Sequence, residues 1–179
     1  MVQTTLAPDQ LPLGATDIGG GLAALRALFD RHAPHDGFFP TPVASLQLIR
    51  ASAPSDPLSV FYRPALCLVV SGKKRVFLKN QIAEYGPNGH LVISQDLPAL
   101  GQVVEASPQE PYLCLHLRIE HAEINQIVLD HGLPKEPEGA TTQAARGLYV
   151  EPSSAALVDA ILRLVRLLDT PADLAAIAP

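Results

Sequence analysis

Charged residues are scarce in this chain. Asp, Glu, Lys and Arg make up 17% of its 179 residues, whereas 47% of the residues are hydrophobic. A disordered chain has the opposite balance, because it contains too few apolar side chains to form a core. The composition therefore excludes a disordered chain and predicts a folded one. The length suits one domain with a substantial core better than two.

Positive charge is scarcer than negative charge. The chain has 13 Lys and Arg against 18 Asp and Glu, which gives a net charge of −5. A domain that binds nucleic acid directly normally presents a basic face, so this balance speaks against DNA or RNA as a direct partner. One local basic run, Lys73-Lys74-Arg75, lies at the mouth of a predicted hairpin, where we expect a solvated turn.

Cysteines and long apolar runs are also few. The two cysteines, Cys67 and Cys114, lie inside apolar segments, which favours buried, reduced thiols over a disulfide framework. No apolar run approaches the roughly 18 residues that span a bilayer. The N-terminus also lacks the charged and apolar segments of a signal peptide. We therefore expect a cytoplasmic protein with no membrane partner.

Sequence motifs of catalysis are missing as well. No Gly-x-Ser-x-Gly motif of a serine hydrolase occurs. The run Gly19-Gly20-Gly21 lacks both the Lys-Ser/Thr pair and the preceding strand of a phosphate-binding loop. Burial in apolar strands would also make either cysteine unreactive by raising its pKa. We therefore expect no enzymatic activity.

Short apolar segments separated by Gly, Pro and Asn dominate the chain between Val43 and Ile119. They recur every eight to twelve residues or so, which is typical of a small all-β barrel or sandwich. The segment 65–71 is apolar on both faces, as expected for a central strand covered on each side. The predicted strands cover residues 43–49, 60–62, 65–71, 75–79, 82–85, 90–94, 102–106, 112–119 and 147–150.

Helical spacing marks three other segments. Asp17 can cap a helix that runs to about His32, although the three glycines favour a start nearer Leu22. A second helix is predicted over 121–131. The last helix is expected to start at about residues 152–154, where Pro152 suits the first helical position and Ser153 or Ser154 lies nearby, and to run to about Leu168. We expect a loose arm at 1–16, an exposed loop at 133–145 and a linker at 170–179.

The predicted strand 112–119 places different residue types on its two faces. Leu113, Leu115, Leu117 and Ile119 share one face, and Tyr112, Cys114, His116 and Arg118 share the other. In one interpretation the leucines form the barrel core and the polar face meets solvent or another protomer. In the other, Tyr112, Cys114 and His116 lie along a ligand cavity.

The last helix carries a wide apolar stripe. The stripe could simply pack on the barrel, but a small barrel seldom needs so much apolar helix surface, so part of it could meet a partner helix. We therefore predict a homodimer whose interface includes Leu157, Ile161, Leu164, Val165 and Leu168.

Five segments, in this order, resemble the N-terminal domain of AraC-type transcription regulators. The sequence departs from the usual family pattern at two positions. Ser71 precedes the Gly-Lys pair where the family often has Gln, and Gly89 is shifted by one place from the usual glycine. Both positions fall in predicted turns. The five segments are Arg63–Val76, Tyr85–Pro98, Glu110–Ile119, Gly147–Pro152 and Arg163–Asp173.

The resemblance implies a fold that is mainly β with flanking helices. It would be a cupin-like (double-stranded β-helix) barrel with C-terminal dimerisation helices. Residues 1–40 would form the arm and first helix, 41–150 the barrel, and 151–179 the last helix and the start of a linker. In this family a separate C-terminal half with two helix-turn-helix motifs binds DNA, and this chain is expected to lack it.

The resemblance further implies a sensor that binds a small-molecule effector in its barrel, without catalysis. We predict that the cavity is touched by Cys67, His90, Tyr112, Cys114 and His116. Cupins often hold metal through a His-x-His pair, which is absent here, so we expect no metal and no other cofactor. Two alternatives remain: a small cupin enzyme, either an isomerase or a dioxygenase, and a purely structural dimerisation module without a ligand.

Overall fold

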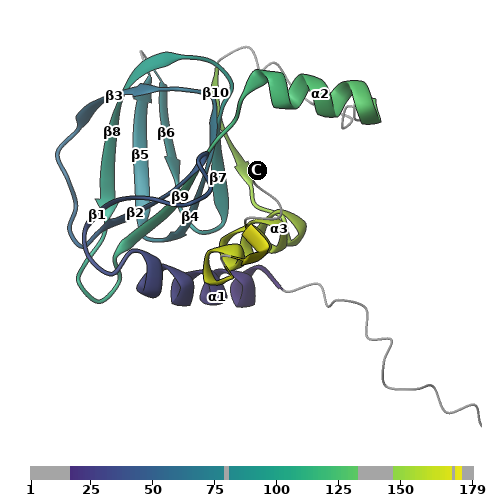
Figure 1. Cartoon of the computed structure of the whole chain (residues 1–179). Coiled ribbons are helices and arrows are strands. Elements are labelled where there is room, and N and C mark those ends of the chain that lie inside the picture. Colours follow the sequence, from purple (N-terminus) through teal and green to yellow (C-terminus); the bar gives the residue numbers. More distant parts are fainter. Residues whose placement is uncertain (1–16, 79–80, 133–146, 171, 175–179) are drawn as a thin grey trace, which may run out of the picture.

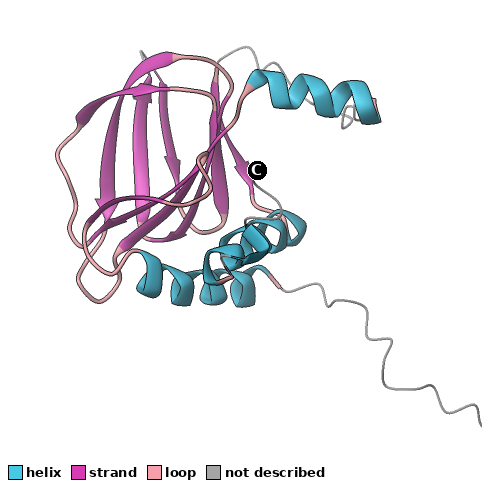
Figure 2. Ribbon diagram, in the orientation of Figure 1, coloured by secondary structure: helices cyan, strands magenta, loops and turns pink. Residues whose placement is uncertain are grey.

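The computed structural model describes residues 17–78, 81–132, 147–170 and 172–174. Its strands form two antiparallel sheets that face each other, with helices on the outside (Figure 1, Figure 2). The predicted arm at 1–16 and loop at 133–145 lie outside the described residues, as does most of the predicted linker at 170–179.

The larger sheet has six strands in the order β1-β2-β9-β4-β7-β10. The smaller sheet has four strands in the order β3-β8-β5-β6. In the larger sheet the bounds are Gly37–Pro40 (β1), Leu46–Ala51 (β2), Tyr112–Arg118 (β9), Ala65–Ser71 (β4), Gly89–Ile93 (β7) and Leu148–Pro152 (β10). In the smaller sheet they are Leu58–Tyr62 (β3), Leu97–Glu105 (β8), Lys73–Leu78 (β5) and Gln81–Tyr85 (β6).

Strands that follow each other in the sequence mostly fall in opposite sheets. The chain passes from β2 in the larger sheet to β3 in the smaller one, returns to β4, and crosses again to β5. This alternation is how a double-stranded β-helix is wound. The expected fold class, a mainly β, cupin-like barrel with flanking helices, is confirmed. The barrel was expected over 41–150, but β1 lies just before residue 41 and β10 continues to Pro152.

Most strands differ from their predicted bounds by only a few residues, and the larger differences are at β1 and β8. β1 was not predicted, and β8 begins at Leu97 instead of Gln102, with Pro98 inside it. Among the described residues, Pro98 has a partner on one side only, which suits a residue that has no N–H to donate. Pro98 is paired with Phe61 of β3, whereas the pairing with β5 begins only at Leu100.

Helix α1 spans Ile18–His32 and includes all three glycines of its first turn, so the predicted later start at Leu22 is wrong. The Asp17 carboxylate accepts a hydrogen bond of 2.6 Å from the Gly20 N–H. An N-cap of this kind is worth about 1 kcal/mol, which offsets the poor helix propensity of a glycine.

Helix α3 spans Ala155–Arg166 and continues into a short 3₁₀ turn, Leu167–Asp169. Ser154 is its N-cap, since its hydroxyl accepts a hydrogen bond of 3.1 Å from the Leu157 N–H. The prediction that Pro152 opens this helix is wrong, because Pro152 is the last residue of β10 and pairs with Gly89.

One hydrophobic cluster joins α1 and α3 to the outer face of the larger sheet (Figure 1). Ile161 and Val165 of α3 lie within it and are only 4% and 0% exposed. Their predicted place at a dimer interface is therefore wrong, because a single chain already buries them. The cluster includes Leu25, Phe29, Leu48, Leu68, Leu113, Leu115, Ile161 and Val165.

A second cluster occupies part of the space between the two sheets. β9 contributes to both clusters: Leu113 and Leu115 face the helices, and Tyr112 and Cys114 face the barrel interior. All four side chains are at most 1% exposed. The two faces of β9 thus separate the outer core from the inner one.

Helix α2, His121–His131, has the predicted extent but buries none of its residues. It projects from the barrel on the side away from α1 (Figure 1). Leu129 on this helix is 79% exposed. No helix within the described residues is long and apolar enough to cross a membrane.

We expect Leu115→Ala to lower the free energy of unfolding by about 2–5 kcal/mol, because it leaves a cavity beneath α1 and α3. The matched control, Leu129→Ala on the exposed α2, should change it by less than about 0.5 kcal/mol. Urea unfolding followed by circular dichroism measures both. Equal losses in the two variants would contradict the two-core description.

Candidate functional site

A cavity of about 520 Å³ lies between the two sheets. Both sheets contribute to its wall: β1, β2, β4 and β9 from the larger one, and β3, β5 and β8 from the smaller one. Much of the lining is apolar. The apolar residues include Ile49, Leu58, Val60, Phe61, Tyr62 and Val103. A space of this size inside a small barrel is suited to a small ligand.

Four of the five predicted site residues line this cavity: Cys67, Tyr112, Cys114 and His116. The fifth, His90, does not. Its neighbours Leu91 and Ile93 belong to the inner cluster, whereas the Nδ1 atom of His90 lies 3.3 Å from the Ser153 hydroxyl near the start of α3. His90 is thus placed away from the cavity. A ligand-binding role for the other four stays a prediction.

Three buried tyrosine hydroxyls lack a partner among the described residues, and two of them, those of Tyr62 and Tyr112, belong to residues that line the cavity. Among the described residues, no hydrogen-bond partner is found for the hydroxyl groups of Tyr62, Tyr85 and Tyr112. Burial raises the pKa of all three tyrosines, so each hydroxyl keeps its proton and can donate it in a hydrogen bond. A buried polar group without a partner costs about 1–3 kcal/mol, which makes the hydroxyls of Tyr62 and Tyr112, the two tyrosines that line the cavity, candidates for ligand contacts.

Lys74 is the important residue that the sequence analysis missed. The expected solvated turn at Lys73-Lys74-Arg75 is instead the start of strand β5. Lys73 and Arg75 point outwards, where their side chains approach Glu84 at 3.6 Å and 2.7 Å. Lys74 lies on the same face as Val76, which is fully buried, and lines the cavity. The alternation of Lys74, Val76 and Leu78 was the signal that could have revealed it.

Gly101 makes room for the Lys74 side chain. A Cβ atom at Gly101 would lie 2.9 Å from the Tyr62 hydroxyl oxygen and 3.2 Å from Lys74 Cε. The Lys74 ammonium is 5.7 Å from the centroid of the Tyr62 ring, a cation–π distance. Burial lowers the pKa of Lys74, but Tyr62, Cys114 and Cys67 raise it, and the net direction is upwards. Lys74 is therefore a cation at neutral pH.

The charges around the cavity are all positive. Arg50, Arg63, Lys74 and Arg118 line it, and no Asp or Glu does so within the described part of the chain. Arg118 forms an ion pair of 2.9 Å with Glu120. Lys74 takes part in none of the ion pairs between described residues, although its two neighbours do. An acidic protein thus contains a basic cavity.

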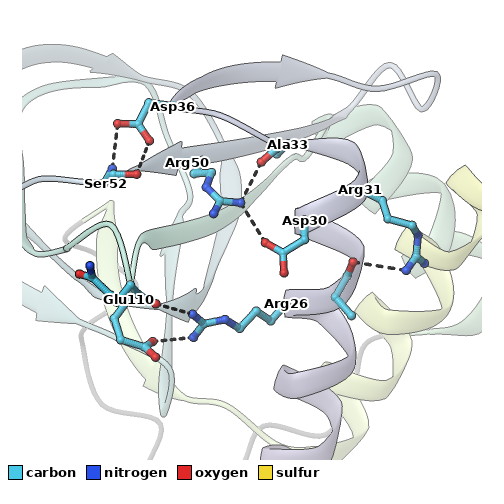
Figure 3. A network of polar contacts seen from close by, with 10 residues as sticks. Arg26, Asp30, Arg31, Ala33, Asp36, Arg50, Ser52 and Glu110 are labelled. Atoms are coloured by element: carbon cyan, nitrogen blue, oxygen red, sulfur yellow. Dashed lines mark hydrogen bonds and ion pairs between the residues drawn. The ribbon is translucent and has the colours of Figure 1, made fainter.

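Arg50 connects this cavity to α1. Its Nη1 atom donates to the Asp30 carboxylate at 3.0 Å and to the Ala33 carbonyl at 3.1 Å (Figure 3). On the same helix, Arg26 forms an ion pair of 2.5 Å with Glu110, just before β9 (Figure 3). The cavity wall and α1 are therefore joined by polar contacts as well as by the outer cluster.

The two cysteines are both buried and free. They lie on neighbouring strands, since Val69 of β4 is paired with Cys114 and Cys67 with His116. A hydrogen bond with Cys114, together with burial, raises the pKa of Cys67 well above its ordinary value. This thiol is therefore protonated at neutral pH and a poor nucleophile. In the described part of the chain, no group of three His, Cys, Asp or Glu side chains is arranged to hold a metal ion.

Residues 42–179 match the family described as the AraC-type transcriptional regulator N-terminus. The chain belongs to this family. The resemblance seen in the sequence is thereby confirmed, and the family is one of transcription regulators. No curated protein matches the chain in sequence.

Among solved structures, the chain is similar to ToxT from Vibrio cholerae. The wild-type protein of strain SCE256 with an unsaturated fatty acid bound shares 12% identity at a TM-score of 0.48, covering 70% of this chain and 46% of that one. The O395 protein bound to (E)-4-(8-methylnaphthalen-1-yl)but-3-enoic acid shares 13% identity at a TM-score of 0.44, covering 68% of this chain and 48% of that one. This chain thus spans less than half of those chains.

We expect the AraC-type domain to lose stability as the pH falls below about 6.5. Burial lowers the pKa of His116, with a smaller effect from Lys74, and burial also lowers the pKa of His90. The unfolded chain therefore binds more protons than the folded one between the lowered and the ordinary pKa. This contribution to stability is complete above the ordinary pKa and is lost as the pH falls through that window.

Thermal unfolding between about pH 7.5 and pH 5.5 measures this effect. His116→Gln should show a smaller fall in Tm than the unmodified chain. The control, His131→Gln on the exposed helix α2, should leave the fall unchanged. An equal fall in all three proteins would mean that His116 does not contribute.

Proposed function

We propose that this domain senses a small-molecule effector and dimerises as part of a cytoplasmic transcription regulator, without catalysis. The observation that carries the proposal is the cavity of about 520 Å³ between the two sheets. DNA contact would come through a C-terminal DNA-binding half of the kind that this family uses, and not through this acidic domain.

The cavity favours a sensor over a purely structural module. A module without a ligand would fill its barrel with its own apolar side chains, because unpartnered polar groups in a core are unfavourable. This barrel instead keeps open space beside the ammonium group of Lys74 and the hydroxyl groups of Tyr62 and Tyr112. The alternative of a cupin enzyme has no comparable support, since the described residues offer no metal-binding group.

The contacts of α1 provide a route from the cavity to the rest of the regulator. Arg50, in the cavity wall, bonds to Asp30 and Ala33 at the end of α1. The next residues on that helix, Arg31 and His32, bond to Asp169 just beyond α3 at 2.5 Å and 2.8 Å. An effector that favours one position of Arg50 over another would bias α1 and α3 together. This requires different affinities for the two arrangements.

We expect at least one compound from a panel of metabolites to raise the Tm of the purified domain. At about a hundredfold excess over Kd, binding adds about 2.7 kcal/mol, which corresponds to a shift of roughly 5 °C or more. Gly101→Val, which fills the cavity beside Lys74 and Tyr62, should abolish the shift. Leu100→Val, on the outer face of the same strand, should retain it. A shift that survives Gly101→Val would place the binding site elsewhere.

The proposed homodimer uses the part of α3 and of the following 3₁₀ turn that the chain itself leaves partly exposed. Leu157, Leu164 and Leu168 are half-buried at the edge of the outer cluster, unlike the buried Ile161 and Val165. Together these three leucines form an apolar strip along the helix. A second copy that pairs through the same strip would give a closed two-fold dimer, the commonest form of homo-oligomer.

We expect the chain to be a dimer by light scattering at tens of micromolar, and Leu164→Glu to shift it towards monomer. Burying a leucine is worth about 1.5–3 kcal/mol, so a charge at this position should weaken the dimer about tenfold or more. The control, Arg166→Glu on the exposed side of α3, should leave the dimer intact. A monomeric unmodified chain would overturn the proposal, and a Leu164→Glu variant that unfolds would assign Leu164 to the core instead.

A further inference from the structure

Lys74 is an unusual residue to find in the wall of an apolar cavity. Its neighbours Lys73 and Arg75 face outwards and form ion pairs with Glu84, but no described carboxylate pairs with Lys74. A charged side chain of this kind is unfavourable in an apolar interior unless an opposite charge or hydrogen-bond acceptors meet it. The protein itself does not provide an opposite charge among its described residues.

Two tyrosine hydroxyls in the cavity lining also lack acceptors among the described residues. Lysine is only a donor, and the hydroxyl protons of Tyr62 and Tyr112 have no acceptor among the described residues. Gly101 keeps the space next to Lys74 and Tyr62 open, since a Cβ there would lie 3.6 Å from the ammonium nitrogen. The Lys74 ammonium and these two hydroxyls thus adjoin a space that is lined by no acidic side chain of the described chain.

We infer that the effector is an organic monoanion with an apolar body, whose carboxylate is received by the Lys74 ammonium and by the hydroxyl groups of Tyr62 and Tyr112. This inference rests on the proposed function. A single ammonium group matches a single negative charge. The apolar wall, which includes Ile49, Val60 and Val103, would contact the remainder of the molecule.

The remaining basic residues support an anion over a neutral ligand. Arg63 and Arg118 line the cavity but are exposed, so they belong to its rim. Positive charge at the rim attracts an anion towards the opening, although the chain as a whole carries a net charge of −5. A cationic effector would meet repulsion both at the rim and at Lys74.

Three probes with the same apolar body test the inference: octanoate, octanamide and octylammonium. Titration calorimetry on the purified chain should show that octanoate binds about tenfold or more tightly than either of the others. Lys74→Met should remove this preference, leaving octanoate no better than octanamide. Lys74→Arg should retain part of it, because it keeps the charge.

Lys73→Met is the matched control, since Lys73 is adjacent in sequence but points outwards to Glu105 at 2.6 Å. It should leave octanoate binding unchanged. Tyr62→Phe, which removes only a hydroxyl group, should weaken octanoate binding several-fold and provides a second test if Lys74→Met does not fold. Circular dichroism verifies the fold of each variant.

Equal binding of octanoate and octanamide to the unmodified chain would overturn the anion site but leave the sensing cavity in place. Unchanged octanoate binding in both Lys74→Met and Tyr62→Phe would also overturn it. A third outcome is that none of the three probes binds and no compound of the metabolite panel shifts the Tm. That result would overturn the sensing function and with it the anion site.

Discussion

The burial of both faces of the central strands is the constraint on which the rest of this structure depends. β9 places Leu113 and Leu115 against α1 and α3, and Tyr112 and Cys114 against the barrel interior. A slip of one residue in its pairing with β4 would exchange the two sets, putting leucines in the cavity and polar groups beneath the helices. The register of β9 therefore determines both the helix layer and the composition of the cavity wall.

This arrangement links a largely apolar cavity, which carries a few polar and basic groups, to the helical layer through one thickness of sheet. Arg50 reinforces the link, because it lines the cavity and bonds to Asp30 and Ala33 at the end of α1. Asp169, just beyond α3, in turn bonds to Arg31 and His32 of α1. In a sensor, these contacts would allow a change at the cavity wall to alter the position of the C-terminal helix without any rearrangement of the barrel.

The cavity also represents a balance between stability and function. The ammonium group and the tyrosine hydroxyls have no partners among the described residues, and such groups lower the stability of a core. Well-packed apolar residues would serve a merely structural barrel better. Such groups are common where a ligand completes the set of contacts. The buried helix layer stabilises the domain independently, so the cost at the cavity is tolerated.

The sequence by itself determined the class of the fold and the place of most of its elements. The strand at 65–71 and the helix at 121–131 match β4 and α2, because turn residues and apolar periodicity mark them locally. It also predicted that Cys67, Tyr112, Cys114 and His116 touch a cavity, and all four line the one between the sheets. The alternation of residue types along the strand 112–119 indicates which of its side chains share a face. Local patterns could not show that β1 joins the sheet or that β8 begins as early as Leu97, with Pro98 inside it.

Only the tertiary structure decided which surfaces meet. Leu164 and Val165 are adjacent and both apolar, yet one is partly exposed and the other buried, because α1 covers only part of the stripe on α3. Lys73 and Lys74 are identical in type, yet the pleat of β5 sends one to Glu105 and the other into the cavity. The physical reason is the same in both cases: a pattern fixes which residues share a face, but only packing against distant segments fixes what that face contacts.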